Sequence, residues 1–168
     1  FPEFTEPSKG YHGLVYSEAL GEAAYIAKIR LEGLRDFGGA LSPFNAFQII
    51  QGLETLSVRI KKHSKSALKL AQWLEKQEEV SWVNYPGLKS APYHELAKKY
   101  LPKGQSGLVT FGLKGGYEAA QKVVDSVKYF SLLANIGDTK SLIIHPASTT
   151  HQQLTDSEQE STGVSKDL

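Results

Sequence analysis

The chain has 168 residues, of which 40% are apolar and 22% charged, the balance of a globular protein large enough for one domain with a core. The formal net charge of +1 is too small to hold nucleic acid or an anionic membrane, and no apolar run approaches the roughly 18 residues of a membrane span. We therefore expect no nucleic-acid or membrane partner. The absence of cysteine excludes disulfides, thiolate metal sites and a cysteine nucleophile, and it agrees with the cytoplasmic location that we expect.

The start of the chain is predicted to be loop-like. Pro2, Pro7, Gly10 and Gly13 interrupt residues 1–17, and proline and glycine both disfavour regular structure. No stretch resembles a signal peptide, and the sequence contains no methionine. We therefore expect the chain to be a piece of a longer polypeptide.

Helical spacing of apolar residues fills the next part of the chain. From Glu18 onward they recur every three or four positions as far as Gly38, where glycine can end a helix because it adopts the left-handed conformation at little cost. A longer helix is predicted over residues 43–63, since Ser42 is a natural N-cap and proline fits the first helical position. A separate helical stretch is predicted from residue 64.

The second half of the chain is predicted to run strand, helix, strand, helix, strand, strand. Runs rich in β-branched and aromatic residues indicate the strands, and amphipathic patterns indicate the helices. Polar residues 156–168 are expected to contain no stabilising element. The predicted strands and helices occupy residues 80–85, 90–101, 107–113, 117–130, 131–138 and 141–146.

Two histidines, His145 and His151, have a spacing that is found in zinc sites. A zinc site needs three or four ligands, however, and the other histidines lie in unrelated segments. Pro146 also argues against a helix that presents both rings on one face. We therefore expect no metal, with His145 at the end of a strand and His151 in a turn, where it has a hydrogen-bonding role.

The common catalytic motifs are missing from the sequence. It contains no G-x-S-x-G nucleophile motif, no P-loop and no G-x-G-x-x-G dinucleotide motif. From the residues alone, we expect a soluble α/β or α+β domain that belongs to something larger.

Two long stretches of the sequence are distinctive: RDFGGALSPFNAFQIIQGLETLSVRIKKHSKSA (residues 35–67) and SLIIHPASTTHQQLT (residues 141–155). Both resemble the pyridoxal-phosphate enzymes of cysteine and methionine metabolism. The resemblance implies an α/β fold, as the C-terminal portion of a fold-type I transferase. Residues 1–65 would be a connecting segment and helices that leave the large cofactor domain. Residues 66–168 would be a truncated small domain, with a mostly antiparallel sheet and helices on one side.

Three shorter motifs are FTEPSKGYHGLVY, ANIGDTKSL and PASTTH. They are similar to one branch of this family, the O-acetylhomoserine sulfhydrylases. This resemblance implies synthesis of homocysteine from O-acetyl-L-homoserine and sulfide, with pyridoxal phosphate as the electron sink and a lysine that carries the cofactor and moves protons. Cystathionine γ-synthases and the methionine and cystathionine γ-lyases of the same family remain alternatives, as does a non-catalytic interaction module.

The resemblance also locates the expected site residues. It implies that the catalytic lysine and most of the cofactor-binding residues lie upstream of Phe1, and that an arginine for the substrate carboxylate lies beyond Leu168. Asn135 replaces a family serine beside that carboxylate, where its amide can donate in place of the hydroxyl, and Thr150 matches a family threonine that lines the same pocket. These two are the substrate-binding residues expected in this chain. From residue type alone, Asn135 would belong to a turn and Thr150 would be a cap. The implied partners are the rest of the polypeptide and, for the full-length protein, a homotetramer.

Overall fold

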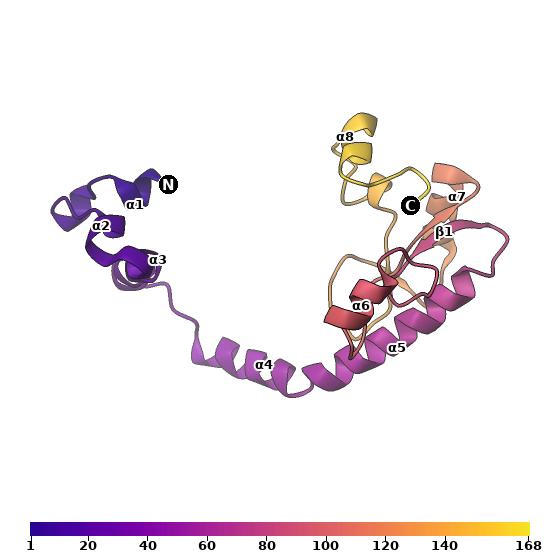
Figure 1. Ribbon diagram of the computed structural model, residues 1–168, viewed down its shortest axis with the longest axis horizontal. Helices are drawn as coiled ribbons and strands as arrows, with labels where there is room; N and C mark the ends of the chain where they lie inside the picture. Colours follow the sequence, from indigo (N-terminus) through magenta and orange to yellow (C-terminus); the bar gives the residue numbers. More distant parts are fainter. The chain divides into compact units, whose positions relative to one another are not determined.

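The computed structural model describes residues 1–168 and divides them into two compact units, Phe1–Gly52 and Leu53–Leu168 (Figure 1). None of the helices combines the length and the apolar composition that crossing a membrane requires. The boundary expected after residue 65 lies inside a continuous helix of the second unit. The assignment of residues 1–65 and 66–168 to two domains of a larger enzyme stays a prediction.

The first unit is built from short helical segments. The prediction of an irregular start was wrong in part, because a helix begins at Pro2 and another at Tyr16. The long helix expected from Glu18 is interrupted at Gly21, whose φ of +50° is not helical, but it ends at Gly38 (φ +70°) as predicted. The segments are α1 (Pro2–Thr5), η1 (Lys9–Tyr11), α2 (Tyr16–Leu20), η2 (Gly21–Ala23), α3 (Ala24–Lys28) and the π-helical η3 (Ile29–Asp36).

A buried tyrosine holds the first unit together. Tyr16 is inaccessible to solvent, and its hydroxyl donates to Glu32 Oε1 at 3.0 Å. Burial, together with this hydrogen bond to a carboxylate, raises the pKa of Tyr16 to about 12. The Lys28 ammonium contacts both oxygens of Glu32, at 2.6 and 2.7 Å, and lies over the Tyr16 ring. Charge and aromatic contacts therefore join α2 to α3 and η3.

Helix α4 (Pro43–Glu54) begins as predicted, because Ser42 Oγ accepts a hydrogen bond from Asn45 N at 3.1 Å. The break expected between residues 63 and 64 was wrong. The helix is interrupted at Thr55, and α5 then runs without a break over Leu56–Leu74. Its buried stripe has helical spacing and continues through the expected break, at Ser64, Ala67, Ala71 and Leu74.

The second unit has the predicted order of strands and helices. The predicted antiparallel pairing is confirmed for β1 and β2, whereas β3 and β4 form a separate parallel pair that was not predicted. Apolar patterns indicate strands without indicating their pairing direction. The elements are β1 (Val80–Asn84), α6 (His94–Tyr100), β2 (Thr110–Leu113), α7 (Gly116–Ser126), β3 (Ser131–Leu132), β4 (Leu142–Ile143), η4 (Pro146–Ser148) and α8 (Asp156–Ser161).

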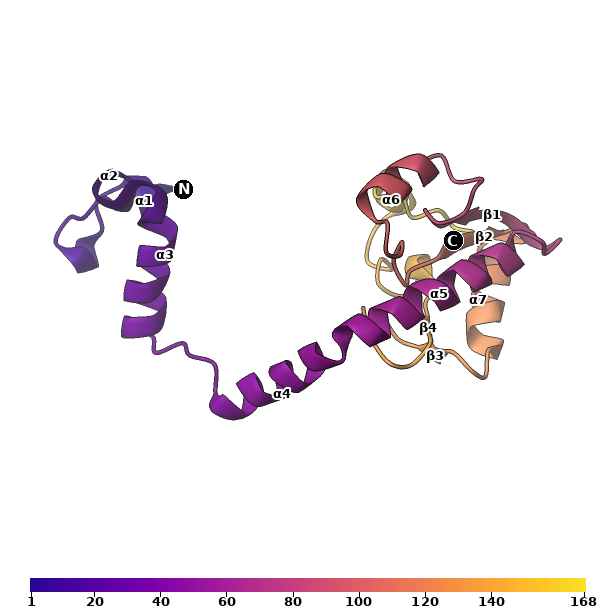
Figure 2. The ribbon, with the colours of Figure 1, turned by 60° about the horizontal axis from the view of Figure 1, so that its bottom comes forward.

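The core of the second unit lies between α5 and β1, and α7 packs against β2 (Figure 2). Ala67 and Ala71 of α5 face Tyr85 and Leu88, which follow β1. The fully buried Tyr85 hydroxyl lies 3.2 Å from Ser64 O and 3.0 Å from a carbonyl of the loop before β2. Burial raises the pKa of this phenol, so it stays protonated and donates. The core therefore holds α5 and β1 together.

Candidate functional site

Asn135 and Thr150 lie in segments that follow two neighbouring parallel strands. Asn135 is in the loop after β3, and Thr150 is in the turn after β4. Because the two strands run parallel, both segments leave the pair at the same edge, outside the carboxyl ends of the strands. Ligands bind at this edge in open α/β sheets. Both side chains are exposed, and no hydrogen bond joins them.

Asn135 organises its own loop. Its Oδ1 accepts a hydrogen bond from Ile136 N at 2.9 Å, and its Nδ2 donates to Asp138 Oδ2 at 3.2 Å. The other oxygen of Asp138 accepts from Lys140 N at 2.9 Å. These bonds, with that of Lys140 N the strongest, lower the pKa of Asp138 and keep it charged. The turn expected from residue type is therefore present, and one Nδ2 proton of Asn135 is left to donate to a ligand.

A helical arginine fixes the same loop from α5. Arg59 Nη1 donates to Gly137 O at 2.9 Å. Gly137 has a φ of +79°, a conformation that glycine adopts without strain. Sequence reasoning missed this contact, because one arginine in a basic helical segment gives no signal of a distant partner.

Thr150 lies in a turn that begins at a buried histidine. His145 is 1% exposed, and its carbonyl accepts from Thr149 Oγ1 at 2.8 Å. Its Nε2 lies 3.3 Å from Lys166 O, and since a carbonyl only accepts, Nε2 carries the proton. Nδ1 of His145 lies 2.8 Å from Ser148 Oγ, which also donates to His145 O at 3.4 Å. Thr150 Oγ1 lies 2.9 Å from Nδ1 of His151.

The two histidines therefore have separate polar roles. His145 lies just beyond β4 and His151 lies in a turn, each with a hydrogen-bonding partner, as predicted. The structure contains no group of three or more histidine, cysteine, aspartate or glutamate side chains that could hold a metal ion.

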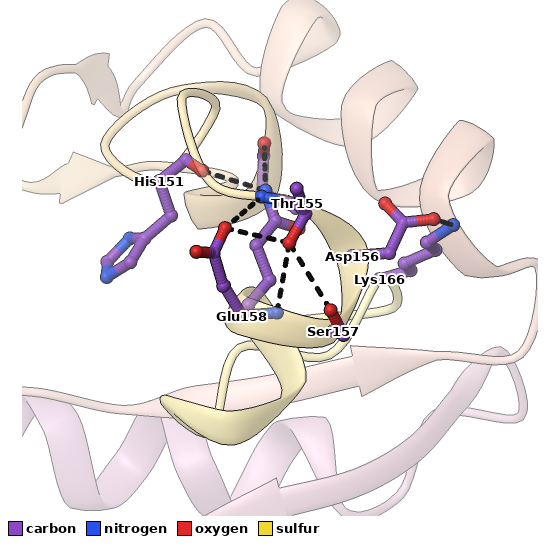
Figure 3. Close-up of polar contacts among 8 residues, drawn as sticks. His151, Thr155, Asp156, Ser157, Glu158 and Lys166 are labelled. Atoms are coloured by element: carbon purple, nitrogen blue, oxygen red, sulfur yellow. Dashed lines mark hydrogen bonds and ion pairs between the residues drawn. The ribbon is translucent and has the colours of Figure 1, made fainter.

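The polar tail contains a helix that was not predicted. In α8, Glu158 N donates to Thr155 Oγ1 at 3.4 Å, and Thr155 N donates to Glu158 Oε2 at 2.8 Å (Figure 3). This reciprocal pair is a capping box, and the sequence T-x-x-E that encodes it was available as a signal. The expectation that residues 156–168 lack a stabilising element was wrong, because the capping box stabilises a helix made of polar residues.

Residues 165–168 are bound to the rest of the second unit. Lys166 Nζ forms an ion pair with Asp156 at 2.6 Å (Figure 3), and the Asp167 carbonyl accepts from Leu113 N at 2.9 Å. Trp82 Nε1 donates to Asp167 Oδ2 at 2.9 Å. Hydrogen bonds from Ser165 and then from Trp82 lower the pKa of the Asp167 carboxyl. These hydrogen bonds therefore attach the tail to strands β1 and β2.

A shallow, open depression lies beside the Thr150 turn. Its volume is about 440 Å³, and Tyr117, Ser148, Leu154 and Lys166 are among the residues that line it. Thr150 itself does not line it, and neither does Asn135. The two candidate residues thus lie on an exposed edge and not in a closed pocket of this chain.

The lysines of this chain differ in their surroundings. A lysine that carries a cofactor must lose its proton, which burial favours and a neighbouring carboxylate opposes. Every lysine except Lys28 is exposed. The Lys28 amine donates to both oxygens of Glu32, and this contact lowers the pKa of Glu32.

Comparison with known proteins identifies relatives along the whole chain. Residues 8–168 match the family described as Cys/Met metabolism PLP-dependent enzyme. An O-acetyl-L-homoserine sulfhydrylase of Thermus thermophilus is 54% identical over 100% of this chain, which spans 40% of that protein. The chain therefore spans well under half the length of such a relative.

Two solved structures of such enzymes are also similar to this chain. The crystal structure of a putative O-acetylhomoserine (thiol)-lyase from Campylobacter jejuni, with N'-pyridoxyl-lysine-5'-monophosphate, has a TM-score of 0.83 and 45% identity. It covers 99% of this chain, which corresponds to 39% of that chain. A cystathionine gamma synthase from Xanthomonas oryzae has a TM-score of 0.69 and 37% identity, over 79% of this chain and 34% of its own. The α/β architecture and the sequence together show that the chain belongs to the pyridoxal-phosphate-dependent enzymes of cysteine and methionine metabolism.

Proposed function

We propose that this chain is the C-terminal part of an O-acetylhomoserine sulfhydrylase, an enzyme that makes homocysteine from O-acetyl-L-homoserine and sulfide. The observation that carries the proposal is the 54% identity, over the whole chain, to a protein named O-acetyl-L-homoserine sulfhydrylase. The full-length enzyme would act in the cytoplasm as a homotetramer.

Asn135 and Thr150 are the proposed contacts of the substrate carboxylate. Both follow the carboxyl ends of parallel strands, and both offer donors to an anion. One Nδ2 proton of Asn135 is used by Asp138, so the other is free to bind. When His151 Nδ1–H donates to Thr150 Oγ1, the threonine hydroxyl can donate to a carboxylate. The two side chains would orient the amino acid, while bound pyridoxal phosphate supplies the electron sink.

The cofactor-carrying lysine is proposed to lie in polypeptide outside these 168 residues. The exposure of the other lysines and the ion pair of Lys28 both support this placement. In this arrangement residues 1–65 connect to the cofactor domain, and residues 66–168 supply the substrate side of the site.

Steady-state kinetics of the full-length polypeptide that contains this sequence test the proposal. Homocysteine should form from O-acetylhomoserine and sulfide. Asn135→Ala and Thr150→Val should each raise the KM for O-acetylhomoserine by about tenfold, the usual cost of one hydrogen bond to a charged group. The KM for sulfide should not change. Failure to form homocysteine would overturn the assigned reaction, and an unchanged KM in both variants would overturn the assigned contacts.

Cystathionine γ-synthase is the second candidate, because such an enzyme has a similar structure over 79% of this chain. The same preparation should then use cysteine in place of sulfide and release cystathionine. Comparison of the two kcat/KM values decides between the reactions, since both thiols would compete for one intermediate site.

A further inference from the structure

The side chain of Gln159 lies beneath the turn that carries Thr150. It belongs to α8 and is only 6% exposed. Its Nε2 donates to Ala147 O at 3.2 Å and to His151 O at 2.8 Å. These two carbonyls lie on either side of Thr150 in sequence, so a single amide group closes the turn from both ends.

The two hydrogen bonds add a side-chain support to a turn that backbone bonds also hold. Thr149 N and His151 N donate to Pro146 O at 3.2 and 2.9 Å, Gln152 N donates to Thr149 O at 3.3 Å, and Leu154 N donates to His151 O at 3.0 Å. Ala147 is buried, so the loss of the Gln159 donor would leave its carbonyl out of contact with water. The amide therefore adds to the stability of this conformation of the turn.

Gln159 is itself held firmly. The capping box of Thr155 and Glu158 fixes the first turn of α8 just before it. At the other end of the helix, Gln159 O accepts from Val164 N at 2.9 Å and from Thr162 Oγ1 at 2.8 Å. Because the backbone of Gln159 is fixed, its side-chain amide can hold the two carbonyls of the turn in place.

We propose that Gln159 is a positioning residue, which sets the place of the Thr150 hydroxyl by holding the turn and does not touch the substrate. This inference rests on the proposed contact between Thr150 and the substrate carboxylate. Sequence reasoning gave no sign of it, because a glutamine in a polar helix is expected to face solvent.

Hydrogen exchange of the 168-residue chain tests the clamp without any activity. Gln159→Glu replaces two donors by acceptors that face carbonyls, and Gln159→Met keeps the length of the side chain without a buried charge. Both should speed the exchange of amides in residues 148–152 by about tenfold, the effect of losing about two modest hydrogen bonds. Gln153→Glu makes the same chemical change at an exposed position of the same segment, and should have no effect.

Kinetics of the full-length enzyme then separate positioning from general stability. Gln159→Met should raise the KM for O-acetylhomoserine by about tenfold, with kcat and the KM for sulfide nearly unchanged. The circular dichroism spectrum and the exchange of α5 should match the wild type, which shows that the variant is folded.

The possible outcomes separate the clamp, the positioning role and the substrate contact. Unchanged exchange in both Gln159 variants would overturn the clamp. A raised KM in Thr150→Val without any change in Gln159→Met would overturn the positioning role alone. An unchanged KM in Thr150→Val would overturn the proposed substrate contact, and with it the positioning role, even if the exchange confirms the clamp.

Discussion

Amide and guanidinium side chains order both segments of the candidate site. Asn135 forms its turn locally, whereas Arg59 and Gln159 reach the two segments from helices. Arg59 and Gln159 donate to backbone carbonyls, which offer acceptors at fixed positions whatever the neighbouring side chains are. Both segments thus depend in part on residues that would not touch the substrate.

Replacement of Arg59 tests this at the loop after β3. Arg59→Met removes the donor to Gly137 O but keeps most of the apolar stem. We expect faster hydrogen exchange at Ile136 and Lys140, and a rise of about three- to tenfold in the KM for the amino-acid substrate of the full-length enzyme. Lys62→Met removes a charge from an exposed position of the same helix and serves as the control. Equal effects of the two variants would show that charge, and not the contact, matters.

The helices differ in what stabilises them, and α8 depends on a titratable cap. Hydrogen bonds from Thr155 lower the pKa of Glu158 below its ordinary 4.5. A lowered folded-state pKa means that the ionised carboxylate stabilises α8 fully above pH 4.5, and that this contribution is lost as the pH falls through the lower, folded value. We expect the Thr155 amide resonance to shift, and α8 to fray, in that acidic range.

Glu158→Gln provides the matched control for this titration. Glutamine preserves the capping box but does not ionise, so the acid transition of the Thr155 resonance should disappear while α8 stays formed. An identical transition in both proteins would show that another group controls the helix.

Helix α4 has a different problem, since none of its residues is buried. Phe44, Phe47, Ile50 and Leu53 are each more than half exposed. Contiguous apolar surface of this kind indicates that another surface covers it. We expect the 168-residue chain to bind a hydrophobic dye and to self-associate, and Phe47→Ser to reduce both in fluorescence and sedimentation measurements.

Tyr129 offers the control for α4. It is 83% exposed but lies outside the helix. Tyr129→Ser should therefore leave dye binding and sedimentation unchanged. If it has the same effect as Phe47→Ser, general exposure of aromatic groups, and not the α4 surface, drives association.

Local signals predicted more of the fold than non-local ones. Ser42 and Pro43 predicted the start of α4, and Gly38 predicted the end of the preceding helix, because caps and left-handed glycines act within a few residues. The direction of β3 against β4 depends on pairing between separate segments, which periodicity does not encode. The α8 capping box was readable but missed, since the tail looked uniformly polar.

The candidate site shows the same division. The resemblance selected Asn135 and Thr150, and the turn at Asn135 follows from its residue type. The supports of these segments, Arg59 and Gln159, were not predictable, because each acts from a helix on a backbone carbonyl of another segment. Such contacts depend on how α5 and α8 pack, which a single sequence does not reveal.

At the scale of the whole molecule, the chain corresponds to part of the length of its relatives. It is similar along its full length to proteins of which it spans 39 or 40%. Its lysines are exposed or paired, and its candidate substrate residues lie on an open edge. These features support an enzyme in which this chain orients the substrate while other polypeptide carries the cofactor.

The most direct test of this account is to map the lysine that carries pyridoxal phosphate in the full-length protein. Borohydride reduction fixes the cofactor to its lysine, and peptide mass spectrometry then locates the pyridoxyl group. The account predicts one stoichiometric label on a lysine outside these 168 residues, and none within them. A stoichiometric label on any lysine of this chain, Lys28 included, would contradict it.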